Sequence, residues 1–207
     1  MKLNNDFLVL DLETTAGQDE NGFQTNNDII QIGAVLLDRN LDPIAEFESL
    51  VKPREIVSEF VTNLTGISNK EAQSAKEFIE VSNNLQRLVE SKVKNIKQVR
   101  ICAWGTYFDL PIIRRLYKEY GLQFPYSGTG FDIKTLAMLW MSLSDRRTDK
   151  LSVGHLAEIM GYTPKEAFHN ALIDSRVEAK ILKRIIFDLD KGTFFNGQLI
   201  KLFSSEL

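Results

Sequence analysis

Three short strand-like segments follow one another within the first 51 residues, and this arrangement constrains the fold more than any other feature. The segments are Phe7 to Leu12, Ile29 to Leu37 and Ile44 to Val51. The first is a short apolar run ending in charge, which is typical of a buried strand that reaches a sheet edge, and the other two have the pattern of further strands. The turn-forming segment 39–43 separates the second segment from the third, as in a hairpin. We therefore expect the chain to begin with three strands, two of them joined by a tight turn.

The rest of the chain alternates between strand and helix patterns. Val99 to Trp104 is a fourth apolar run, and an amphipathic helix is expected from Leu110 to Tyr120. Further helices are expected at 59–89 with an interruption near Gly66, and at about 135–143, 152–160 and 171–188. This order predicts an α/β fold with a mixed central sheet flanked by helices. We expect a single domain over residues 1–207, with its core at about 6–188 and a C-terminal tail at 189–207.

Composition and charge exclude several classes of protein. Hydrophobic residues make up 43% of the chain and charged residues 26%, which excludes a disordered or fibrous protein. The 25 basic and 28 acidic side chains give a net charge of −3, so bulk positive charge cannot hold nucleic acid. Cys102 is the only cysteine, which excludes an intrachain disulfide. The longest strongly apolar stretch, 136–143, is too short to span a bilayer. We expect a cytoplasmic protein with no membrane partner.

Asp11 and Glu13 lie two residues apart at the end of the first predicted strand, so their side chains leave the same face. Phe7 and Val9 precede them on that face, and the two carboxylates therefore continue a buried row. Adjacent buried anions require a cation to offset their repulsion, and a hard divalent ion with oxygen ligands meets that need. The alternative is a solvated strand end.

Two further positions carry candidate chemistry. Asp109 follows the fourth strand directly, where it is either a metal ligand or the N-cap of the next helix. His169 precedes Asp174 by five residues, a separation that would put them on different faces of one helix. If His169 lies just before the helix, both face one cleft. The alternative is an exposed histidine beside a capping Asn170.

These positions together resemble the DEDDh 3′→5′ exonucleases of the ribonuclease H-like superfamily, a group that includes proofreading exonucleases, ribonuclease T and small-RNA-trimming exoribonucleases. The resemblance rests on Asp-x-Glu in the first strand, Phe-Asp at a helix start and His-x-Ala-x-x-Asp near the end. It extends from Phe7 to about Ile185. Flanking segments that also match are 28–35, 63–68 and 131–134.

The resemblance implies a role for each residue. Asp11, Glu13, Asp109 and Asp174 would hold two Mg²⁺ or Mn²⁺ ions, and His169 would be the general base. This chemistry suits the residue types, because two metal ions promote in-line phosphodiester cleavage and a neutral imidazole can take a proton from water. Thr14, Thr15, Trp104 and Tyr107 would contact the substrate. The expected product is a 5′-mononucleotide released from the 3′ end of single-stranded RNA or DNA.

The substrate preference and two other functions stay open at this stage. Segment 58–67 resembles the small-RNA-trimming branch, which favours RNA slightly, whereas Ile173 stands where that branch usually has a second aspartate. The alternatives to an exonuclease are a ribonuclease H-type endonuclease and a catalytically inactive exonuclease fold that serves as a binding module. Either a monomer or a homodimer is compatible with the sequence.

Overall fold

The computed structural model describes residues 3–15, 27–144, 146, 148–149, 151–162 and 168–191 of the chain. Its five-stranded sheet has the order β3-β2-β1-β4-β5. β1 pairs antiparallel with β2 and parallel with β4, so the predicted mixed sheet is confirmed. The strands are β1 (Phe7–Thr14), β2 (Ile29–Leu37), β3 (Pro43–Leu50), β4 (Arg100–Ala103) and β5 (Phe131–Asp132).

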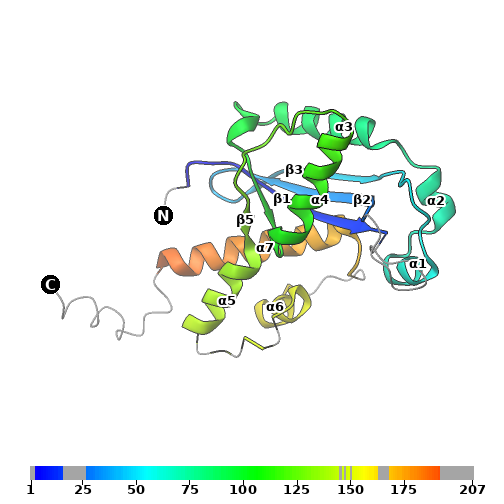
Figure 1. Ribbon diagram of the computed structural model, residues 1–207. Helices are drawn as coiled ribbons and strands as arrows, with labels where there is room; N and C mark the ends of the chain where they lie inside the picture. The colour runs from blue at the N-terminus through cyan, green and yellow to red at the C-terminus, as the bar shows by residue number, and fades with distance from the viewer. Residues whose placement is uncertain are drawn as a thin grey trace, which may run out of the picture.

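Helices cover both faces of this sheet (Figure 1). α3 (Phe78–Glu90) and α4 (Thr106–Glu119) lie on one face, where they pack against Leu8 and Leu10 of β1. The other face carries α5 (Ile133–Leu143), α6 (Val153–Met160) and α7 (Ala171–Lys191), which pack against Phe7 and Val9. The strict alternation of β1 between the two cores follows from the two-residue period of a strand. Asp11 and Glu13 therefore continue the row of Phe7 and Val9, as the sequence predicted, and this is the face that α7 covers.

Two short helices, α1 (Glu59–Thr65) and α2 (Asn69–Gln73), connect β3 to α3 at one end of the sheet (Figure 1). Gly66 ends α1 with a φ of 77°, which confirms the predicted interruption. Within the helical region expected at 59–89, the main helix begins only at Phe78. The reason is that the backbone of Lys76 pairs with the chain at Val51 and Lys52, which keeps this segment extended.

The segment after β4 differs from the sequence-based expectation. α4 begins at Thr106 rather than at Leu110, because Gly105 adopts a left-handed φ of 87° and turns the chain directly into the helix. Asp109 consequently lies inside the first turn and is not the N-cap. The two-residue strand β5 was not expected at all.

The last described helix extends to Lys191, so residues 189–191 of the predicted tail are helical. Residues 192–207 lie outside the described part of the chain. Among the described residues, no helix has the length and apolar character needed to cross a membrane.

Candidate active site

A cavity of about 570 Å³ opens at the carboxyl end of β1, between α4, α6 and α7. The predicted carboxylates and the predicted histidine all line it. The lining residues are Asp11, Leu12, Glu13, Trp104, Tyr107, Phe108, Asp109, Ser152, Val153, Gly154, Phe168, His169, Asp174 and Glu178. Three separate segments of the chain thus bring their acidic side chains to one place.

β1 supplies the first two carboxylates. Asp11 is half-buried and Glu13 is buried, and they continue the row of Phe7 and Val9 toward the strand end. Because the strand pairs on both sides, its backbone holds the two side chains at a fixed spacing. Two carboxylates are therefore presented side by side to the cavity.

α4 supplies Asp109, which is only 5% exposed. The backbone N–H groups of Leu12 in β1 and of Asp109 itself favour the charged form of this carboxylate. The carboxylate therefore lies where the first turn of α4 meets the strand that carries Asp11 and Glu13. Its position inside the helix, and not at the cap, is what directs it to the cavity.

The start of α7 supplies His169 and Asp174. His169 has a φ of 70° and lies two residues before the helix, so the chain turns sharply there. Its backbone N–H donates to Oδ2 of Asp174 at 2.9 Å, while the Asn170 side chain accepts from the N–H groups of Leu172 and Ile173. Ligand atoms of Glu13, His169 and Asp174 all lie within 4.8 Å of one another. The predicted placement of His169 ahead of the helix is confirmed, and Asn170 is indeed a capping residue.

The start of α7 lies directly against β2. The backbone N–H of Ala171 donates to Oε1 of Gln31 at 3.0 Å, and Oγ of Ser175 donates to the carbonyl oxygen of Gly33 at 3.0 Å. A Cβ atom on Gly33 would lie 2.0 Å from the carbonyl carbon of Ala171. The helix reaches this position only because residue 33 has no side chain, and Gly33 is the register partner of Asp11.

Burial and mutual repulsion disfavour ionisation of these carboxyl groups. Burial, followed by the charges of Asp174 and Asp109, raises the pKa of Glu13 to about 7. Burial raises the pKa of Asp109 to about 7, against the two backbone N–H groups that favour its charged form. Asp11 has a pKa well above its ordinary value because of burial and the charges of Asp109, Glu13 and Asp174. Burial also raises the pKa of Asp174, although the His169 N–H opposes this.

This donor set fits a hard divalent cation. The described residues that line the cavity include no lysine or arginine to offset the acidic groups. Oδ1 of Asp174 and Oε2 of Glu178 are buried without a hydrogen-bond partner. Oxygen-rich, negatively charged and partly unpartnered surroundings are what Mg²⁺ and Mn²⁺ require.

Aromatic side chains form one wall of the cavity. Trp104 is half-buried, Tyr107 is 73% exposed and Phe108 is 42% exposed. The structure thus brings the predicted residues Trp104 and Tyr107 to the site. Phe108 and Phe168 were not predicted as site residues, because aromatic residues in loops or first helical turns carry no periodic signal.

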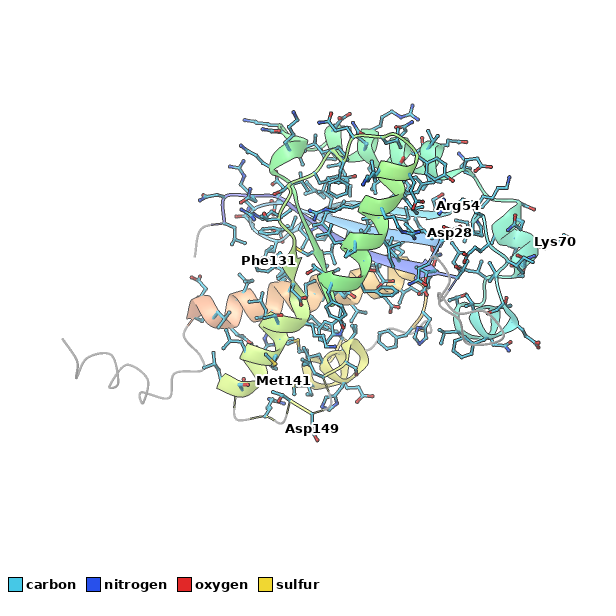
Figure 2. The ribbon with its side chains drawn as sticks, in the orientation of Figure 1. Asp28, Arg54, Lys70, Phe131, Met141 and Asp149 are labelled. Atoms are coloured by element: carbon cyan, nitrogen blue, oxygen red, sulfur yellow. The ribbon has the colours of Figure 1, made fainter. Side chains whose placement is uncertain are left out.

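Thr14 and Thr15 are not among the residues that line the cavity. Both are buried, and the hydroxyl of Thr15 donates to Oε2 of Glu55 and accepts from the backbone N–H of Asp28. Asp28 in turn binds Arg54 at 2.6 Å, a pair labelled in Figure 2. These contacts close the end of β1 onto the segment after β3.

Sequence reasoning missed Glu178, which lies one helical turn after Asp174 on α7 and lines the same cavity. Its spacing from Asp174 was the available signal, because residues four apart share one face of a helix.

Known exonucleases are similar to this chain over most of its length. A family model described as "Exonuclease", named RNase_T, matches residues 8–182. The PolC-type DNA polymerase III of Lactococcus lactis subsp. lactis (strain IL1403) is 31% identical over 116 residues, which is 56% of this chain and 6% of that protein. The 3′-5′ exonuclease DinG of Staphylococcus aureus (strain bovine RF122 / ET3-1) is 28% identical over 176 residues, which is 85% of this chain and 18% of that protein. The chain thus spans less than a fifth of the length of these relatives.

Solved structures share the fold at low sequence identity. The nuclease domain of 3′hExo, a DEDDh family member bound to rAMP, has a TM-score of 0.74 at 19% identity, covering 89% of this chain and 92% of that one. Cell-death related nuclease 4 has a TM-score of 0.73 at 22% identity, and the match covers 88% of this chain and 64% of that one. E. coli exonuclease I in complex with a dT13 oligonucleotide has a TM-score of 0.70 at 17% identity, and the match covers 88% of this chain and 41% of that one.

Proposed function

The chain belongs to the RNase T-type exonuclease family, in its DEDDh group, and we propose on this premise that it is a metal-dependent 3′→5′ exonuclease. It would remove 5′-mononucleotides from single-stranded nucleic acid ends. One observation carries the proposal: Asp11, Glu13, Asp109 and Asp174 meet His169 in a single cavity. The same fold without these five residues in one cavity would support only a nucleic-acid-binding module.

The four carboxylates are the residues that would hold the metal, as two Mg²⁺ or Mn²⁺ ions. When bound, such ions supply Lewis-acid chemistry, which activates water and stabilises the departing 3′-oxygen. Ligand atoms of Glu13 and Asp174 lie within 4.8 Å of each other, and Asp11 and Asp109 line the same cavity from β1 and α4. The raised pKa values of these groups support this proposal, because burial and mutual repulsion disfavour their charged forms and a bound cation would offset both.

His169 is the proposed general base. It is exposed and lines the cavity, with a ring nitrogen within 4.8 Å of carboxylate oxygens of Glu13 and Asp174. The imidazole accepts a proton from the water, whose oxygen forms the new bond to phosphorus. The bond from phosphorus to the 3′-oxygen of the preceding nucleotide breaks, so the phosphate leaves on the released 5′-mononucleotide.

The aromatic wall would receive the terminal base. Trp104, Tyr107 and the neighbouring Phe108 offer apolar surface beside the carboxylates. Stacking on such surfaces stabilises an unpaired base and tolerates any sequence. A single-stranded 3′ end therefore suits the site better than a blunt duplex. The contact of Thr14 and Thr15 with the terminal nucleotide remains a prediction, since they follow Glu13 directly but lie outside the cavity lining.

We propose RNA as the slightly favoured substrate, on the resemblance of segment 58–67 to RNA-trimming relatives. Neighbours of this fold include both a complex with rAMP and a complex with a DNA oligonucleotide, so the fold accommodates either sugar. A cytoplasmic location and a monomeric or homodimeric state remain predictions. The position of His169 at the carboxylates disfavours a ribonuclease H-type endonuclease, which relies on carboxylates and metal alone. The retention of all five residues disfavours an inactive binding module.

The deciding experiment compares linear and circular single strands of identical sequence, as RNA and as DNA, with Mg²⁺ or Mn²⁺. We expect progressive shortening of the 5′-labelled linear strands, release of 5′-mononucleotides and no cleavage of the circles. A preparation of Asp109→Asn serves as the control for contaminating nucleases. Cleavage of the circles at a rate comparable to that of the linear strands would establish an endonuclease. If no strand is cleaved, the remaining alternative is a catalytically inactive binding module.

A further inference from the structure

Glu178 is a buried acidic residue that the assigned roles do not use. It lies on α7 four residues after Asp174, is 1% exposed and lines the same cavity as the other carboxylates. The backbone N–H of Trp104, directly after β4, favours the charged form of its carboxylate. Its Oε2 is buried and has no hydrogen-bond partner.

The surroundings of Glu178 make this carboxylate costly for the fold. Burial raises its pKa well above the ordinary value, and the charges of Asp11, Asp109 and Asp174 raise it further. A buried carboxyl group with an unsatisfied oxygen destabilises a folded protein relative to an apolar side chain of the same shape. Packing alone therefore gives no reason for a glutamate at this position.

A divalent cation in the cavity would offset this cost. We propose that Glu178 is a fifth carboxylate of the divalent-ion site, with Oε2 as the atom that it offers to the ion or to its hydration shell. This inference rests on the proposed function, because it presupposes that the other four carboxylates bind metal. It predicts that the negative charge of Glu178 strengthens ion binding and is not merely a structural partner of Trp104.

A neutral variant of the same shape separates the two roles. Glu178→Gln keeps a carbonyl oxygen that can accept from the Trp104 N–H, but it removes the charge. If the role is structural, the variant keeps the ion affinity of the wild type. If Glu178 belongs to the ion site, the affinity falls by about 10- to 100-fold, the range typical of residues that support metal ligands.

The test is calorimetric titration of the metal-free full chain with Mn²⁺ and with Mg²⁺, together with its melting temperature in the absence of metal. We expect Glu178→Gln to weaken ion binding and to leave the metal-free melting temperature equal to or above that of the wild type. Glu178→Met, neutral and of similar length, provides a second variant should the amide disturb the fold. Asp188→Asn is the matched control, because Asp188 is a buried carboxylate on the same helix, about 15 Å farther along its axis.

The outcomes distinguish this inference from the function on which it rests. Asp188 binds Trp140 and Arg184 away from the cavity, so its variant should keep the wild-type ion affinity. Wild-type ion affinity in folded Glu178→Gln or Glu178→Met would overturn the role of Glu178 and leave the exonuclease proposal intact. Absence of ion binding in the wild type itself would overturn both.

Discussion

Replacement of Gly33 by alanine should displace catalytic groups of the site, although Gly33 itself does not line the cavity. The added Cβ would lie 2.0 Å from the carbonyl carbon of Ala171, 2.2 Å from its oxygen and 2.2 Å from the backbone nitrogen of Leu172. These are backbone atoms of a helix, so no side-chain rotation relieves the overlap. Ordinary contact begins at 3.4 Å, and α7 must therefore move away from β2 by about 1.4 Å.

The displacement determines how much stability and how much cleavage rate the Gly33→Ala variant should lose. Overpacking of this kind destabilises a protein by about 1–3 kcal/mol. The hydrogen bonds from Ala171 to Gln31 and from Ser175 to Gly33 would also lengthen, since both cross the same contact. A shift of about 1 Å in a catalytic group lowers a rate by about 10²-fold. Because the start of α7 carries His169 and Asp174, we expect a loss of cleavage rate of at least that order.

Urea denaturation gives the stability of Gly33→Ala, and single-turnover cleavage of a fluorescent single strand gives its rate. Gly128→Ala is the matched control, because a Cβ at Gly128 meets no atom within 4 Å and its φ is not in the left-handed region. The control should retain wild-type stability and rate. Wild-type values for both quantities in Gly33→Ala would refute the claim that close approach of β2 and α7 positions the site.

Three further predictions concern the charges. Asp11→Asn should abolish cleavage while the melting temperature of the metal-free protein holds or rises, because one of the repelling groups is neutralised; a fall in that temperature would contradict this. His169→Ala should lower kcat by about 10²–10⁴-fold with little change in the metal affinity measured by calorimetry. A kcat near that of the wild type would show that His169 has no catalytic role. The folded-state pKa values of Glu13 and Asp109 are raised to about 7, so the folded state binds more protons than the unfolded state between about pH 4 and 7. The free energy of unfolding in EDTA should therefore fall as pH rises from 5 to 8, and a flat or rising profile from urea denaturation would be the contrary result.

The strand pattern predicted the geometry of the site well where local periodicity determines it. The alternation of Phe7, Val9, Asp11 and Glu13 placed two carboxylates on one face, and the face is the one that α7 covers. The separation of His169 from Asp174 likewise required the histidine to precede the helix, which the left-handed φ at His169 provides.

Other features depend on tertiary contacts that leave little trace in the local sequence. β5 has two residues and exists because Phe131 and Asp132 pair with β4, so no apolar run could indicate it. The early start of α4 follows from the backbone of Gly105, where glycine removes the usual penalty of a positive φ. Glu178 looks like one more charge on a long helix until burial shows that it faces the cavity.

The distribution of the carboxylates over the fold makes ion binding a property of the assembled protein. α4 packs on one face of the sheet and α7 on the other, while β1 between them supplies Asp11 and Glu13. No single segment holds more than two of the four predicted ligands, and in the folded protein these buried groups repel one another. A divalent ion that binds only when all three segments are docked stabilises the folded state by mass action. The ion would thus stabilise the fold at the same place where it supports the chemistry.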